Sequence, residues 1–220
     1  MRVPALCAAS LWLSVIGAGT AVADEAKVAA LTEAYDAKLA HVDIIREIGG
    51  MLTADQYVRF TLSDIIKAEQ MTGEERKAFE KAAGERVDAL DAAHTARLKE
   101  LLQQTTWTEL ADMKPDVASD AWTLVQHSGD LEFMKDTLAK VEPLVREGKM
   151  HGSAYANMYD RVARMEGKPQ YYGTQSRCVD GQFEPSEIDS PETLDTRRQE
   201  LGLQPLDDYF KTLREMYGPC

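Results

Sequence analysis

The sequence predicts a mainly α-helical fold, a multi-helix bundle with one long central helix and a small β-hairpin in the C-terminal third. Three observations predict it. No proline occurs between residues 24 and 114, whereas prolines recur from residue 115 onward. Apolar residues follow helical spacing through the first half. After residue 170 the pattern changes to short, partly aromatic or β-branched runs.

The composition is that of a globular protein with an acidic surface. The 220 residues include 25 Lys and Arg and 37 Asp and Glu, for a net charge of -12, with 44% hydrophobic residues. This length and usage suit one or two packed domains. Because a surface of this sign repels phosphate backbones and anionic headgroups, nucleic acid and membrane surfaces are poor partners.

The first 23 residues are typical of a cleavable signal peptide. Arg2 precedes an apolar run, and Ala21-Val22-Ala23 comes directly before Asp24. The alternative is a membrane anchor, but glycines interrupt the run and it is shorter than the roughly 20 residues needed to span. We therefore expect an exported protein, periplasmic or secreted, with no integral membrane segment after cleavage.

Two long helical patterns follow. An N-terminal helix is expected within residues 24–50, ended by Gly49-Gly50. The remaining residues, 51–220, are expected to form a single helical domain. Thr53 with Gln56 resembles a capping box that begins a second helix. Thr72 begins a third, which continues to about residue 104 and is the candidate central helix.

The later elements are shorter. An irregular stretch from Trp107 to Pro115 precedes them. A β-hairpin at about residues 171–188 is expected to turn at Asp180-Gly181, a dipeptide suited to tight hairpin turns. The expected helices span residues 117–127, 130–147, 153–166, 191–201 and 206–217.

Cys178 and Cys220 are the cysteines left after signal cleavage. In an exported protein such a pair is first interpreted as a disulfide bond. The alternative is two unrelated thiols.

The second helix carries charged residues beside its apolar face. Asp55 and Arg59 can pair one turn apart, with Gln56 next to them. They form either a surface ion pair of small value or part of a binding site.

His127 is the candidate acid or base, and Gln126 lies beside it at the end of a short helix. A histidine there can titrate near neutral pH, or it can simply interact with the helix dipole. No other histidine has partners at metal-ligand spacing, so no metal site or cofactor is predicted.

Asp160 lies on a stripe of small residues in the helix that begins near residue 153. A carboxylate in close packing needs donors. Arg161, Arg164 and backbone NH groups are the candidates.

The stretch from Gln170 to Gln175 alternates amides, phenols and a hydroxyl around a glycine. On a strand, Gln170, Tyr172 and Thr174 would share one face, with Gln175 on the other. Such a face lines a polar pocket, or its groups lock the hairpin to the bundle.

The order of these motifs resembles a family of bacterial proteins classed as a domain of unknown function and marked by a QxYGTQ motif. The resemblance spans about Leu52 to Tyr217, departs from the family at Thr106 and Thr108, and implies that the polar positions belong to one unit. It implies no reaction. The residues that carry it are Asp55-Gln56-x-x-Arg59, Val125-Gln126-His127, Asp160-Arg161, Gln170-x-Tyr172-Gly173-Thr174-Gln175, Arg197-Arg198 and Gly202-Leu203-x-Pro205-Leu206-x-x-Tyr209.

Two hypotheses remain open. In the first, these polar residues form a pocket for a small ligand, with hydrolytic chemistry, in which His127 is the acid or base and Arg59 or Arg161 holds an anion. In the second, the protein is a non-enzymatic envelope interaction or scaffold domain, and the same residues form a buried structural network.

Overall fold

The computed structural model describes residues 24–113 and 116–218. These residues form two units, one ending at Ala40 and one beginning at His41. The second unit contains all the polar positions singled out above. The predicted signal peptide, residues 1–23, lies outside the described residues, so its cleavage stays a prediction.

The first long helical pattern is divided differently from the prediction. Helix α1 (Glu25–Leu39) ends early, and α2 (Val42–Ala68) runs through Gly49-Gly50 without a break. The predicted helix end at this glycine pair and the predicted helix start at Thr53 are therefore both wrong. Glycine costs about 1 kcal/mol relative to alanine inside a helix, but the flanking Ile48 and Met51 are buried in the core. Their burial outweighs the local preference.

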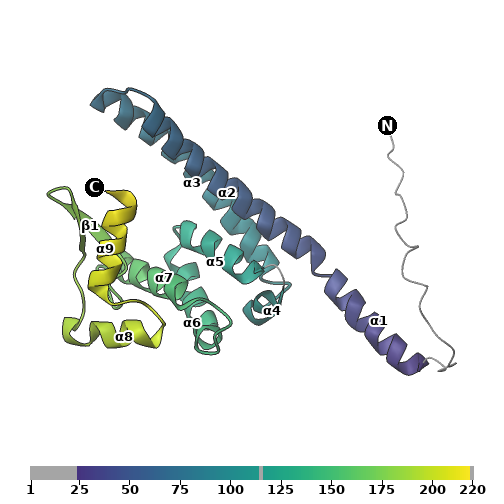
Figure 1. Ribbon diagram of the computed structural model, residues 1–220. Coiled ribbons are helices and arrows are strands. Elements are labelled where there is room, and N and C mark those ends of the chain that lie inside the picture. The colour runs from purple at the N-terminus through teal and green to yellow at the C-terminus, as the bar shows by residue number, and fades with distance from the viewer. Residues whose placement is uncertain (1–23, 114–115, 219–220) are drawn as a thin grey trace, which may run out of the picture. The chain divides into compact units, whose positions relative to one another are not determined.

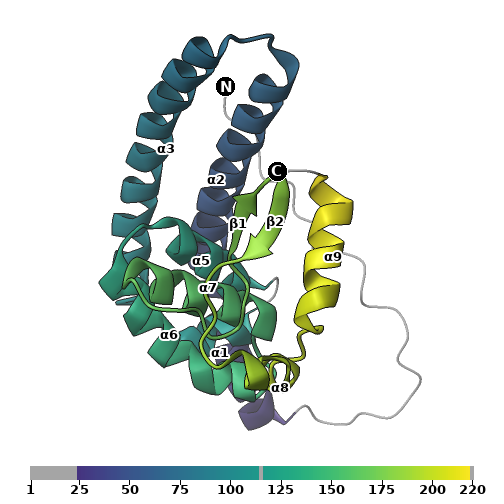
Figure 2. The ribbon, with the colours of Figure 1, turned by 90° about the vertical axis from the view of Figure 1, so that its left-hand side faces the viewer.

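The α2 and α3 helices form a long antiparallel hairpin (Figure 1, Figure 2). Helix α3 (Gly73–Leu101) begins at the predicted capping box, in which Thr72 and Glu75 bond reciprocally. It is the long helix that the sequence predicts. Its buried residues, Thr95, Leu98 and Leu101, lie in its last turns, where it enters the core.

The core lies where α5 packs against α2 and α3 and where α6 packs against α7. Trp122 is central to it, with its ring 6.3 Å from that of Trp107 and 6.4 Å from that of Tyr155. The stretch predicted to be irregular contains a short helix, because Thr106 and Glu109 form a capping box. The helices of this part are α4 (Trp107–Asp112), α5 (Val117–His127), α6 (Leu131–Arg146) and α7 (Gly152–Met165).

The β-hairpin is confirmed but is shorter than predicted. Asp180 and Gly181 both have positive φ and make the turn. Residues 171–175 are not in a strand. The hairpin and the elements after it are β1 (Ser176–Val179), β2 (Gln182–Pro185), a 3-10 turn (Pro191–Thr193), α8 (Leu194–Glu200) and α9 (Leu206–Tyr217).

Two predictions about the rest of the chain have different outcomes. Cys220 lies outside the described residues, so its pairing with Cys178 stays a prediction. Within the described part of the chain, no helix combines the length and apolarity needed to cross a bilayer.

Candidate functional site

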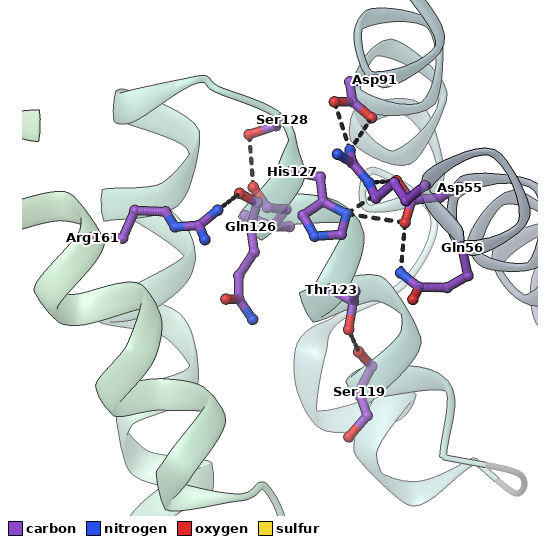
Figure 3. A network of polar contacts seen from close by, with 11 residues as sticks. Asp55, Gln56, Asp91, Ser119, Thr123, Gln126, His127, Ser128 and Arg161 are labelled. Carbon is purple, nitrogen blue, oxygen red and sulfur yellow. Dashed lines mark hydrogen bonds and ion pairs between the residues drawn. The ribbon is translucent and has the colours of Figure 1, made fainter. Parts of the chain in front are cut away.

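A buried carboxylate on α2 is the centre of the first polar cluster (Figure 3). The Asp55 side chain is completely buried. Its oxygens accept hydrogen bonds from Arg59 Nε at 3.0 Å, from Gln56 Nε2 at 2.8 Å and from His127 Nδ1 at 3.0 Å. These donors compensate for the loss of water around the charge.

The donors keep Asp55 ionised. Burial raises the pKa of this carboxyl, but the charge of His127 and the hydrogen bonds from Arg59 and His127 lower the pKa by more, to below its usual value. A charged carboxylate can only accept hydrogen bonds. Nδ1 of His127 must therefore carry its proton.

Arg59 connects this carboxylate to the neighbouring helix. Its Nη2 lies 2.7 Å from both carboxylate oxygens of Asp91 on α3. Burial lowers the pKa of the guanidinium, but the hydrogen bonds to Asp91 and Asp55 raise the pKa above its usual value. Arg59 is thus engaged by two carboxylates.

His127 is the last residue of α5, and its side chain is 22% exposed. Because Asp55 holds the protonated Nδ1, the other ring nitrogen, Nε2, has an acceptor lone pair in the neutral ring. No residue that the structure describes is hydrogen-bonded to Nε2. A buried carboxylate behind a histidine is the arrangement that orients imidazole for proton transfer in many hydrolases.

Arg161 on α7 approaches from the opposite side (Figure 3). Its Nη1 donates to the backbone carbonyl of Gln126 at 2.8 Å. Burial lowers the pKa of Arg161, and the positive charges of Arg59 and Arg164 lower the pKa further. Within the described residues no carboxylate pairs with Arg161. The charges that act on Arg161 are those of two other arginines.

These side chains surround a cavity of about 520 Å³. Three arginines and His127 face it, against a single acid, Asp91. Two methionine side chains complete part of its wall. The lining residues are Arg59, Asp91, Gln126, His127, Gly129, Met134, Arg161, Arg164, Met165 and Gln175. Another cavity, of about 580 Å³ between α6 and α7, is lined by none of the predicted site residues.

The second polar cluster is closed around Asp160, whose side chain is also completely buried. One oxygen accepts from the backbone NH groups of Tyr171 and Tyr172, at 2.7 and 2.8 Å. The other accepts from the NH and the hydroxyl of Thr174, both at 2.8 Å. Among the donors considered from sequence, the backbone NH groups hold Asp160, together with the Thr174 hydroxyl.

Gln170 extends this cluster toward the hairpin. Its side chain is buried, donates to the carbonyls of Gln175 and Ser186, and accepts from the NH of Gln175. Tyr172 is 9% exposed, and its carbonyl accepts from Arg198 Nη1 at 2.6 Å. The chain therefore folds around Asp160 instead of extending as a strand.

The predicted residues separate into two groups. Those at the cavity are Arg59, Gln126, His127, Arg161 and Gln175, with Asp55 and Gln56 behind them. Those in the closed loop are Asp160, Gln170, Tyr172 and Thr174.

Sequence reasoning missed two charged residues of the cavity. Asp91 carries no local signal, because its partner Arg59 is 32 residues away. The sequence suggests Arg164 only as a donor to Asp160. Its position three residues after Arg161 was the available signal, since this spacing puts both side chains on one helix face.

Comparison with known proteins identifies a family but no function. The model of a family of unknown function, DUF6624, matches residues 42–219. No curated protein and no solved structure matches the chain. The match begins at α2 and includes both polar clusters.

Proposed function

Because the chain belongs to this family of unknown function, we propose a function from the geometry of the cavity. The protein binds a small anionic ligand there and hydrolyses it, with His127 as the acid and base. One observation carries the proposal: the fully buried Asp55 holds Nδ1 of His127, and His127 lines a cavity that also contains Arg161.

The charges at the cavity support an anionic ligand. Arg59, Arg161 and Arg164 line it, and only Arg59 has carboxylate partners within the described residues. The protein as a whole is strongly acidic, so the charge at the cavity is opposite in sign to the net charge of the protein. Partly buried cations attract anions more strongly than exposed ones, because less water screens them.

The hydrogen-bonded pair of Asp55 and His127 supports proton transfer. Nε2 of His127 can take a proton from a water molecule and return it to the leaving group. Asp55 stabilises the imidazolium that forms in between. Arg161 can stabilise negative charge that develops on the substrate.

A ligand screen with matched variants tests this proposal. We expect a small-molecule anion to raise the melting temperature of the wild-type protein, because ligand binds the native state preferentially. His127→Gln should abolish hydrolysis and retain binding within about threefold, whereas Arg161→Gln should lose binding. His151→Gln, at an exposed position outside the cavity, is the control. If His127→Gln and Arg161→Gln change stability but neither binding nor turnover, the proposal is wrong.

We further propose that the protein is exported after removal of residues 1–23. The Arg2, apolar and Ala21-Val22-Ala23 pattern supports it, and cleavage would leave Asp24 in place to cap α1. The intact mass of protein from the periplasmic fraction should correspond to a chain beginning at Asp24. The same spectrum, with and without reductant, tests the disulfide predicted between Cys178 and Cys220.

A further inference from the structure

The two arginines of α7 at the cavity suggest which anion binds. Arg161 and Arg164 lie three residues apart on this helix, and both line the cavity. Within the described residues, neither forms an ion pair with a carboxylate. We infer that the ligand is a phosphate monoester whose phosphate group is held by Arg161 and Arg164, next to His127. This inference rests on the proposed function.

The ion pairs of the chain itself show how its arginines bind anionic oxygens. A single guanidinium group of Arg59 contacts both oxygens of Asp91. Likewise, Arg97 contacts both oxygens of Glu47. One guanidinium can therefore contact both oxygens of a carboxylate. A phosphate presents three terminal oxygens, so it offers acceptors to both Arg161 and Arg164.

The charges agree with this class of ligand. Three arginines oppose Asp55 and Asp91, which leaves one positive charge with neutral His127 and two when His127 is protonated. A phosphate monoester carries about -1.5 to -2 charges at pH 7. A carboxylate or a sulfonate carries one at most, so it compensates the cluster only while His127 is neutral, whereas a phosphate compensates it in both states.

The rest of the cavity has space for the organic part of an ester. The volume of about 520 Å³ exceeds what a phosphate group needs. Met134 and Met165 line it, and thioether side chains adapt to rings and irregular apolar groups. We therefore place a small apolar or aromatic group against these methionines.

The hydrolytic step uses only water and residues of the chain. Nε2 of His127 takes a proton from water as the water oxygen forms a bond to phosphorus. The ester P–O bond breaks, and its electron pair stays on the leaving oxygen. The imidazolium returns its proton to that oxygen, so the products are an alcohol and inorganic phosphate. Arg161 and Arg164 offset the charge on the phosphate oxygens.

Calorimetric titration with three matched anions tests the inference. Phenylphosphonate has the charge and shape of the expected ligand and cannot be hydrolysed. Benzenesulfonate keeps the tetrahedral group with a single charge, and phenylacetate replaces it with a carboxylate. We expect the phosphonate to bind at least tenfold more tightly than either. p-Nitrophenyl phosphate measures turnover.

Two variants and a control complete the experiment. Arg164→Gln changes an exposed side chain, so the fold should persist, and phosphonate binding should weaken at least tenfold. Arg161→Gln should do the same. Arg146→Gln, which removes an exposed partner of Glu142 on α6, should change nothing.

The failures are distinguishable. Equal or tighter binding of phenylacetate or benzenesulfonate overturns the phosphate assignment and leaves the anion site standing. Phosphonate binding that is unchanged in Arg164→Gln and Arg161→Gln also overturns the assignment. If none of the three anions binds the wild-type protein, the inference and the proposed function both fail.

Discussion

Asp55 and Asp160 are both completely buried, yet they are held by different kinds of donor. Asp160 accepts four hydrogen bonds from backbone NH groups and a hydroxyl within one loop. Asp55 accepts from the side chains of Arg59, Gln56 and His127, which belong to two helices. The donors to Asp160 all belong to one loop. One donor to Asp55 is the ring of His127, which lines a cavity, so the donors to a buried acid indicate more about its role than its burial does.

The largest expected effect is that of Asp160→Asn. The amide turns two donor hydrogens toward groups that are themselves donors, and each buried donor left unsatisfied costs about 1 to 3 kcal/mol. We expect the free energy of unfolding to fall by about 3 kcal/mol or more, as measured by urea denaturation. Asp136→Asn, at an exposed i,i+4 pair with Lys140, should change it by less than about 0.5 kcal/mol. A small effect of Asp160→Asn would contradict the closed-loop interpretation.

Asp55→Asn is expected to have a smaller effect on stability, about 2 kcal/mol, because fewer donors converge on this carboxylate. Its effect on turnover should be larger, since the amide no longer stabilises the imidazolium of His127. If Asp160→Asn reduced turnover as strongly, once corrected for the unfolded fraction, the contrast between the two acids would fail.

The contribution of Asp55 to the free energy of unfolding should also depend on pH. Its folded-state pKa is lowered, below an unfolded value of about 3.9. The ionised group therefore stabilises the fold above that pH, and this contribution is lost as the pH falls through the folded-state pKa. The difference in unfolding free energy between wild type and Asp55→Asn should shrink in acid. A difference that is constant between pH 7 and pH 2.5 would show that the charge of Asp55 is not what stabilises it.

The smallest effects concern two glycines. Gly173 lies in the Asp160 loop with φ of +69°, and a Cβ there would be 2.8 Å from Leu206 Cδ1. Gly173→Ala should cost about 1 to 2 kcal/mol. Gly84 lies in α3 with open space around it, so Gly84→Ala should stabilise by about 0.5 to 1 kcal/mol. Thermal melting of the two variants would separate loop conformation from helix propensity.

Local signals account for what the sequence predicted correctly. The capping box of Thr72 and Glu75 begins α3, and Asp180-Gly181 makes the hairpin turn. Each depends on residues within a few positions. Thr106 and Glu109 form a signal of the same type, a capping box that begins α4 within the stretch predicted to be irregular.

Tertiary contacts account for the errors. Because Ile48 and Met51 are buried, α2 continues through the two glycines between them. Asp160 draws residues 171–174 into a loop that alternation alone assigned to a strand. In both cases the deciding partner is distant in the sequence, so no local pattern contains it. For the candidate site, residue types were informative, but their division between cavity and loop required the fold.

The contact between Arg59 and Asp91 also determines how the two long helices are aligned along their length. Sliding α3 past α2 by one turn, about 5.4 Å, would replace Asp91 with residues of the neighbouring turns, of which the less exposed ones, Val87 and Thr95, carry no charge. Neither can neutralise the guanidinium, so the shifted arrangement leaves a partly buried charge without its counterion. The ion pair thus favours one position of α3 along α2, the position that places Asp91 in the wall of the cavity.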